Sequence, residues 1–380
     1  MKVFFHGWFS GFIEKTNPGI NYEFFINIFN RVYGEDCQIG TFEDSDILCE
    51  YMAIYSNTYV MHSESALKKK DWKHTYCFSG ESWTNKLKDE YDCVLWGERN
   101  HKNVVNVPLF IPYCYTNNFV EQLHEKRVRN DIPKGDVCVV VSNPNGPVRN
   151  KFLERLEKRC NVTYMGRYKN NIGGLLPFDY NNEKFIDLIS KFKFIVSMEN
   201  SENDTYITEK ILHGMIAKTI PIYWGSKRIH DYFTKERFIN LENDDEATIN
   251  NVIDRIIELK NDSKKWLDMV NHNELASDGN LWRNNDEIAK DIKCLLTHKC
   301  WSNLSRIHII SNKVGEPERY ERMTQLMNSL NIDESCIKII GPTLIASQFL
   351  SLISFKKSSK SRISSPNNKS LSTIKKTPSL

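Results

Sequence analysis

Five side chains that could bind a phosphorylated ligand lie close together in the stretch SMENSENDTYITEKILHGMIAKTIPIYWG, residues 197–225. They are Glu199, Asn200, Tyr206, Glu209 and Lys210. The apolar run before them ends at Met198, and in a parallel sheet ligands bind beyond the carboxyl ends of the strands. Thr208 is a good N-cap, which would place Glu209 and Lys210 in the first turn of a helix.

The start of such a helix suits a phosphate group. Its first N–H groups have no partner within the helix, and the helix dipole adds partial positive charge there. Lys210 contributes a full positive charge, whereas the carboxylate of Glu209 would repel phosphate and is better used on the hydroxyls of a ribose. The pattern predicts a nucleoside diphosphate site, although an acidic residue in a first turn can equally serve only to complement the helix dipole.

Short apolar runs alternate with helical segments along most of the chain, and these elements must position the site. A first series, residues 1–132, contains the predicted strands KVFFH, DILCEY, KHTYCF, YDCVLW and NVVNVP and the predicted helix YEFFINIFNRVY. After the joint RNDIPKGD, a second series over residues 133–300 alternates strands and helices. β-Branched runs without polar alternation are typical of parallel sheets covered on both faces. We therefore predict an α/β protein with two Rossmann-like domains that face each other across a cleft.

The chain changes character after residue 300. Residues 304–343 predict a strand, a loop and an amphipathic helix, which form an incomplete αβ segment. Residues 344–380 are rich in Ser and Lys, which predicts a disordered basic tail. The segment TLIASQFLSLISF before the basic run is too short to span a bilayer, and weak contact of the tail with a membrane surface is the alternative to a free tail.

The distribution of charge and cysteine excludes some classes of protein. The 51 basic and 48 acidic residues give a net charge of +3, and seven of the basic residues lie in the last thirty, so the rest of the chain carries −4. This argues against nucleic-acid binding. The ten cysteines form no CxxC pair, and the N-terminus reads as neither a signal peptide nor a membrane span. We expect reduced thiols and a soluble cytoplasmic protein without a transmembrane segment.

The stretch at 197–225 resembles the signature of the α1,3/4-fucosyltransferases, glycosyltransferase family 10, which reads E-N-[ST], then Y-[VI]-T-E-K, then [IV]-P-[IV]-Y-W-G. VVSNPNGPVRNKF resembles the S-N-x-x-x-x-x-R segment of that family, and MGRYKNNIGG resembles its next turn. In the first series, CFSGES, YDCVLWGERN and NVVNVPLFIPY resemble an earlier segment of the family. Ser82 stands where Asn is usual, and WGE stands where G-F is usual. The resemblance is good over residues 75–240 and poor at both ends.

This resemblance implies the GT-B fold and transfer of fucose from GDP-fucose, with inversion, to a glycan acceptor. It implies seven site residues, which are the general base Glu81, the diphosphate ligands Arg149 and Lys210, the ribose ligand Glu209, and Glu199, Asn200 and Tyr206 at the nucleotide pocket. It implies no obligatory metal, and it leaves stimulation by manganese or magnesium ions open. The chemistry agrees, because inversion needs one carboxylate to take the proton of the acceptor hydroxyl. Cationic groups would stabilise the GDP that leaves.

Two other functions stay open at this point. A transferase for another nucleotide sugar would have a similar diphosphate site, and a glycan-binding protein that has lost catalysis would have the same fold. Asp44 and Asp46 have the D-x-D spacing of metal-dependent glycosyltransferases, but they precede a predicted strand instead of following one, so we predict no metal site. Trp8, Phe9 and Trp83 are candidates for stacking on a sugar, although aromatic residues at strand ends more often belong to a core.

The segment RIHIISNKVGEPERYERMTQLMNSLNI, within residues 304–343, resembles the first strand, loop and helix of glycosyltransferase family 25. The rest of such a catalytic domain does not follow it. We interpret this segment as a truncated second enzyme that is not active.

Overall fold

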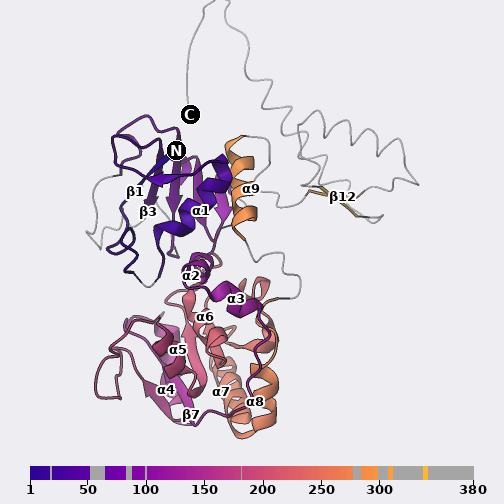
Figure 1. The fold of residues 1–380 in the computed structure, drawn as a ribbon. Coiled ribbons are helices and arrows are strands. Elements are labelled where there is room, and N and C mark those ends of the chain that lie inside the picture. The colour runs from indigo at the N-terminus through magenta and orange to yellow at the C-terminus, as the bar shows by residue number, and fades with distance from the viewer. Residues whose placement is uncertain are drawn as a thin grey trace, which may run out of the picture. The chain divides into compact units, whose positions relative to one another are not determined.

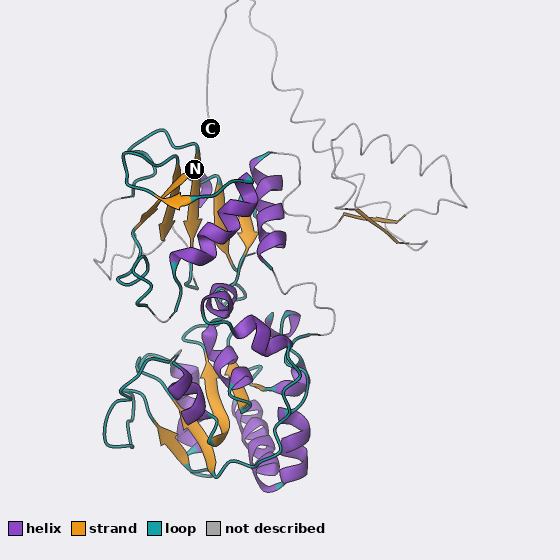
Figure 2. Ribbon diagram, in the orientation of Figure 1, coloured by secondary structure: helices purple, strands orange, loops and turns teal. Residues whose placement is uncertain are grey.

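The computed structural model divides the chain into two compact units, Met1–Leu304 and Ser305–Leu380. The residues that it describes are 1–17, 19–51, 65–82, 88–98, 101–180, 182–276, 284–297, 307–310 and 337–340. The first unit contains two separate sheets of parallel strands, each packed against helices (Figures 1 and 2). The predicted α/β fold with two parallel sheets is therefore confirmed.

The first sheet has six parallel strands in the order β2-β1-β3-β4-β5-β6. They are Lys2–His6 (β1), Gln38–Ile39 (β2), Ile47–Tyr51 (β3), His74–Phe78 (β4), Cys93–Trp96 (β5) and Val104–Asn106 (β6). Helix α1, Tyr22–Tyr33, has the predicted bounds because its ends are capped: Asn21 accepts from the Glu23 N–H, and Gly34 stops the helix at φ 68°. Its apolar face is buried against this sheet.

A helix from the end of the first unit returns to the first sheet. Helix α9, Asn285–Leu296, starts with a capping box at Asn284 and buries its apolar face in the same hydrophobic cluster as α1. Asp286 pairs with Arg31 of α1 at 2.6 Å, and Figure 1 shows α9 in orange beside α1. The sequence pattern predicts this segment within the second series, residues 133–300, but its apolar face packs with the first sheet. The chain therefore passes between the two sheets twice.

The second sheet has five parallel strands in the order β11-β10-β9-β7-β8. They are Gly135–Val139 (β7), Val162–Tyr164 (β8), Phe192–Met198 (β9), Ile220–Trp224 (β10) and Ile239–Asn240 (β11). Its helices are Pro147–Leu156 (α4), Glu183–Ile189 (α5), Glu209–Ile216 (α6), Glu246–Asn261 (α7) and Ser263–Val270 (α8). Helices α4, α7 and α8 cover one face, whereas α5 and α6 lie on the other. Short 3-10 turns are Lys88–Glu90 (η2), Ile229–Asp231 (η3) and Lys235–Arg237 (η4).

Helix α6 lies where the two sheets meet. Its buried face belongs to the hydrophobic cluster of the first sheet, together with α2 (Phe110–Thr116) from the segment that leads through α3 (Phe119–His124) to the second sheet. The Phe110 N–H donates to the carbonyl of Ile207 at 3.1 Å. A Cβ added to Gly97, just after β5, would lie 1.9 Å from the carbonyl oxygen of Thr205. The start of α6 is therefore held closely against the edge of the first sheet.

In the second unit the structure describes one pair of parallel strands, β12 (Ile307–Ile310) and β13 (Ile337–Ile340). The strand predicted in RIHIIS is thus confirmed. The predicted amphipathic helix and the tail at 344–380 lie outside the described residues. Within the described part of the chain, no helix combines the length and apolar character needed to cross a membrane.

Candidate functional site

The end of β9 and the start of α6 are held together by one buried carboxylate. Thr208 is the N-cap of α6, as predicted, and its hydroxyl accepts from the Lys210 N–H. Glu199, the first residue after β9, is fully buried. Its carboxylate accepts from the Thr208 N–H at 2.8 Å, the Thr208 hydroxyl at 2.9 Å and the Lys210 ammonium at 2.9 Å. Each of these contacts is internal, so Glu199 positions the first turn of α6.

Neighbouring carboxylates keep the Lys210 ammonium charged and hold it in position. Burial acts to lower the pKa of Lys210, but the carboxylates of Glu199 and Glu209 outweigh it and raise that pKa above its ordinary value. The ammonium lies 3.9 Å from a carboxylate oxygen of Glu209 and 5.9 Å from the ring centre of Tyr206. The ammonium also donates to the Thr208 hydroxyl at 3.0 Å, and the Lys210 side chain is 26% exposed, whereas Glu199 is buried.

Arg149 joins the start of α4 to the loop after β9. Its guanidinium donates to the side-chain oxygen of Asn200 at 3.2 Å and to the carbonyl of Asn143 at 2.7 Å. Gly146 permits this position, because a Cβ there would lie 2.5 Å from the guanidinium. Arg149 is 1% exposed, and burial lowers its pKa. The arginine and the amide of Asn200 are thus brought together beyond the carboxyl ends of β7 and β9.

Glu81 reaches the same region from the first sheet. It follows β4, its carbonyl accepts from the indole N–H of Trp96 at 3.0 Å, and the next residue, Ser82, accepts from the side-chain amide of Asn203. Burial raises the pKa of Glu81; Lys210 opposes this effect, while the carboxylates of Glu209 and Glu199 add to it. Glu81 therefore lies within the electrostatic field of the start of α6.

Two tyrosines near this region were not predicted from the sequence. The hydroxyls of Tyr113 on α2 and Tyr180 before α5 lie 3.3 Å apart. Burial raises the pKa of Tyr180, and the carboxylate of Glu209 raises it further. The two tyrosines are 67 positions apart in sequence, and no spacing in either segment signals their contact.

The other predicted candidates have local structural partners. Asp44 caps the turn at Thr41, whose N–H donates to it at 2.7 Å, and it also pairs with Lys2. Among the residues that the structure describes, no group of three His, Cys, Asp or Glu side chains could hold a metal ion. Trp8 stacks on Phe12, with 3.8 Å between the two ring centres, within an aromatic cluster. Trp83 lies outside the described residues.

These contacts define what the site can do chemically. An ammonium, a guanidinium and the N–H groups of a helix start together suit a diphosphate. A carboxylate with a raised pKa from the opposite sheet suits proton transfer. All seven predicted site residues therefore lie around the carboxyl ends of β4, β7 and β9 or at the start of α6.

Comparison with known proteins adds a family and named relatives. Residues 132–310 match the family model described as glycosyltransferase family 10 (fucosyltransferase), C-terminal part. A stretch of 144 residues is 34% identical to the alpha-(1,3)-fucosyltransferase FucT of Helicobacter pylori. This match covers 38% of this chain and 28% of that protein. A stretch of 140 residues is 31% identical to the human 4-galactosyl-N-acetylglucosaminide 3-alpha-L-fucosyltransferase 9. This match covers 35% of each chain. The matches thus span about a third of these relatives' length.

Two solved structures show the same fold. An alpha1,3-fucosyltransferase crystallised with GDP-fucose has a TM-score of 0.56 and 19% identity, covering 78% of this chain and 90% of that one. An alpha1,3-fucosyltransferase structure without a named ligand has a TM-score of 0.57 and 20% identity, covering 79% and 91%. The predicted GT-B arrangement of two Rossmann-like sheets is therefore confirmed.

Proposed function

We propose that this chain is an inverting fucosyltransferase, which transfers fucose from GDP-fucose to a hydroxyl of a glycan acceptor in an α1,3-type linkage. The matching family model, the named relatives and the fold support this proposal. The observation that carries it is the contact between the segment after β4 and the segment before α6, where the side-chain amide of Asn203 donates to the carbonyl of Ser82, the residue after Glu81. A proton acceptor and a diphosphate site would then face one reaction centre from two sheets.

The donor would lie with its diphosphate against the first turn of α6. There the ammonium of Lys210 and the free N–H groups of the helix offset the charge of the phosphates. Arg149, whose guanidinium is oriented by Asn200, would approach from α4. Glu209 would accept hydrogen bonds from the ribose hydroxyls, with Tyr206 beside it, and Glu199 would act by holding Lys210 in place.

The reaction itself is a displacement at the sugar carbon that is bonded to phosphate. The acceptor oxygen forms a bond to this carbon and gives its proton to Glu81, while the bond to the phosphate oxygen breaks and GDP leaves with the electron pair. Burial raises the pKa of Glu81, which makes its carboxylate a better proton acceptor than an exposed one. Lys210 and the N–H groups of α6 stabilise the charge that grows on GDP, and they need no rearrangement to do so.

The acceptor would bind over the carboxyl edge of the first sheet, beside Glu81. Trp8, Phe9 and Tyr51 gather there, with the ring of Tyr51 at 5.2 Å from Trp8 and 5.7 Å from Phe9. Burial raises the pKa of Tyr51, and the charge of Glu81 raises it further. All three rings are partly exposed, and the apolar face of a sugar stacks well on such rings.

The test is transfer to a 4-galactosyl-N-acetylglucosaminide, the acceptor named for the human relative, with EDTA present and the product analysed by NMR. We expect an α-linked fucose from the β-linked donor, and at least tenfold weaker GDP-fucose binding in Lys210→Ala. Transfer from GDP-mannose or UDP-galactose instead would mean a transferase for another nucleotide sugar. Glycan binding without turnover of any donor would mean a binding protein, and either result would overturn the proposal.

We also propose that the chain works in a reducing compartment such as the cytoplasm. The support is that all eight described cysteines are free thiols, seven of them buried. Alkylation of the denatured protein, isolated without reductant and with oxidation blocked, should label these eight thiols. Paired cysteines in that sample would contradict the proposal.

A further inference from the structure

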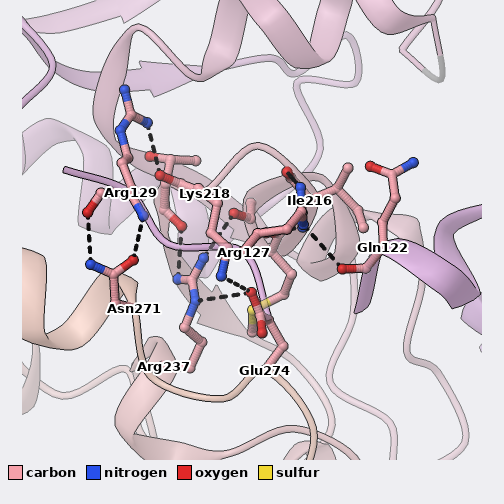
Figure 3. Close-up of polar contacts among 11 residues, drawn as sticks. Gln122, Arg127, Arg129, Ile216, Lys218, Arg237, Asn271 and Glu274 are labelled. Atoms are coloured by element: carbon pink, nitrogen blue, oxygen red, sulfur yellow. Dashed lines mark hydrogen bonds and ion pairs between the residues drawn. The ribbon is translucent and has the colours of Figure 1, made fainter. Parts of the chain in front are cut away.

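The second end of α6 is held by a cluster of charged side chains that the proposed reaction does not use. We call it the α6-end cluster, and it consists of Arg127, Arg129, Lys218, Arg237, Asn271 and Glu274. Figure 3 shows these residues converging from several segments around Ile216, the last residue of the helix. The cluster lies at the opposite end of α6 from Lys210.

Guanidinium groups of the cluster bind the carbonyls at the end of the helix. Arg127 donates to the carbonyl of Ile216 at 2.7 Å, and Arg237 donates to that of Gly214 at 3.3 Å. Arg237 also donates to the carbonyl of Thr219 at 2.8 Å, just after the helix. The last carbonyls of a helix lack partners within it and carry partial negative charge, so cations are favourable there. These contacts fix the position of α6 along its own axis.

The cations of the cluster lie close to a buried carboxylate. Lys218 pairs with Glu274 at 2.5 Å, and Arg237 lies 4.0 Å from the same carboxylate. Arg237 is fully buried, and burial lowers its pKa to about 10. Burial also lowers the pKa of Arg127 and of Lys218. Glu274 thus balances Lys218 and Arg237, Asp131 pairs with Arg129 at 2.9 Å, and the helix carbonyls supply further negative charge.

The cluster also joins the two passages of the chain between the sheets. Arg127 and Arg129 lie on the first passage, between α3 and β7, and Asn271 and Glu274 lie between α8 and α9, before the return. The side chain of Asn271 accepts from the Arg129 N–H at 2.7 Å and donates to the Arg129 carbonyl at 2.8 Å. The end of α6 is therefore fastened to both connections of the first unit.

We propose that Arg127, Arg237 and Glu274 are positioning residues for the nucleotide site. Helix α6 has eight residues and is about 12 Å long, at 1.5 Å per residue, so it moves as a short rigid rod. A shift of its carboxyl end displaces Lys210 and the first N–H groups by a similar amount. The α6-end cluster thereby sets the place where the diphosphate binds, and this inference rests on the proposed function.

The test uses Arg127→Met, because Arg127 is only partly buried and holds the end of α6 from outside. Its matched control is Lys260→Met, which breaks an ion pair at 2.8 Å between Lys260 of α7 and Asp136 of β7, away from α6. Calorimetry compares GDP with guanosine, and hydrogen–deuterium exchange follows residues 208–216. We expect Arg127→Met to raise the Kd for GDP about tenfold, the loss from one lengthened charge-assisted hydrogen bond, and to leave the Kd for guanosine within twofold.

The control variant should leave both affinities and the exchange of α6 as in wild type, whereas Arg127→Met should speed exchange in the first turn of α6. Arg127→Lys, which keeps the charge and one donor, should recover most of the GDP affinity. Unchanged GDP affinity or unchanged exchange in Arg127→Met, or equal losses for GDP and guanosine, would overturn the inference. A wild-type protein that does not bind GDP would instead refute the proposed function, and the exchange result would still show whether the cluster holds α6.

Discussion

Replacing Glu199 by glutamine should lower the free energy of unfolding of the first unit by about 2 kcal/mol. The buried carboxylate accepts three hydrogen bonds, two from Thr208 and one from the ammonium of Lys210. Glutamine keeps one acceptor oxygen, but its NH₂ group would face a donor of Thr208 or Lys210. The substitution also removes the negative charge that pairs with the Lys210 ammonium. A hydrogen bond to a charged group is worth about 1.5–3 kcal/mol. Glu199→Ala should cost more, about 4 kcal/mol, because it removes every acceptor that the carboxylate offers to Thr208 and Lys210.

The assay is urea unfolding followed by far-ultraviolet circular dichroism on wild type, Glu199→Gln, Lys210→Met and the double variant. The two side chains form one contact, so the double variant should be more stable than the sum of the single losses predicts, by about 2 kcal/mol. The urea dependence of the free energy should stay constant, which shows that the same unit unfolds. The same cycle on Asp136 and Lys260, an ion pair at 2.8 Å, provides a reference.

Additive losses in this cycle would refute the reasoning. They would mean that Glu199 and Lys210 do not stabilise each other, and that Glu199 is available to a ligand. A Glu199→Gln variant as stable as wild type would have the same meaning, because a glutamine has one acceptor oxygen and cannot accept from all the donors that Thr208 and Lys210 present.

Three further predictions concern the same region. Gly97→Ala should weaken GDP binding and lower the melting temperature, because its Cβ would lie 1.9 Å from the Thr205 carbonyl; Gly174→Ala, whose Cβ meets nothing within 4 Å, is the control, and equal effects would contradict the packing. The acid limb of kcat/KM should lie above pH 4.5, since the pKa of Glu81 is raised and the base works only when deprotonated; activity should rise with pH through that limb, and a limb at or below 4.5 would exclude Glu81 as the group that titrates. Burial lowers the pKa of His213 to about 4, so the unfolded chain binds its proton first and about 3 kcal/mol of stability should be lost as the pH falls from 6.5 to 4. His213→Phe should flatten that dependence in urea titrations at several pH values, and an unchanged slope would argue that His213 is not the titrating group.

The elements that sequence predicted well have local causes. Helix α1 has the expected bounds because an Asn cap and a left-handed Gly stop lie within its own sequence. Thr208 caps α6 for the same local reason, and Asp245 caps α7, where its side chain accepts from the Thr248 N–H. The strands followed from β-branched and aromatic runs, and the resemblance of residues 197–225 to a known signature pointed to the site.

The features that sequence missed depend on contacts between distant residues. Nothing near Glu199 reveals that its carboxylate is fully buried and used by Thr208 and Lys210, because burial arises from the packing of α6 between the sheets. By residue type, Arg237 and Glu274 would be expected at the surface. They are buried together because the fold brings η4 next to the segment after α8. The return of α9 to the first sheet is likewise decided by tertiary packing, since its apolar face fits either sheet by pattern alone.

The most direct test of the account is a comparison of donor binding and transfer in Glu81→Gln. Glu81 lies on the first sheet, and the proposed diphosphate ligands lie on the second. We therefore predict that this variant binds GDP-fucose within twofold of wild type by calorimetry. Its transfer rate should fall by a factor of about 10² to 10⁴, the usual contribution of a general base. A variant that transfers fucose at the wild-type rate would contradict the central claim that Glu81 takes the proton of the acceptor.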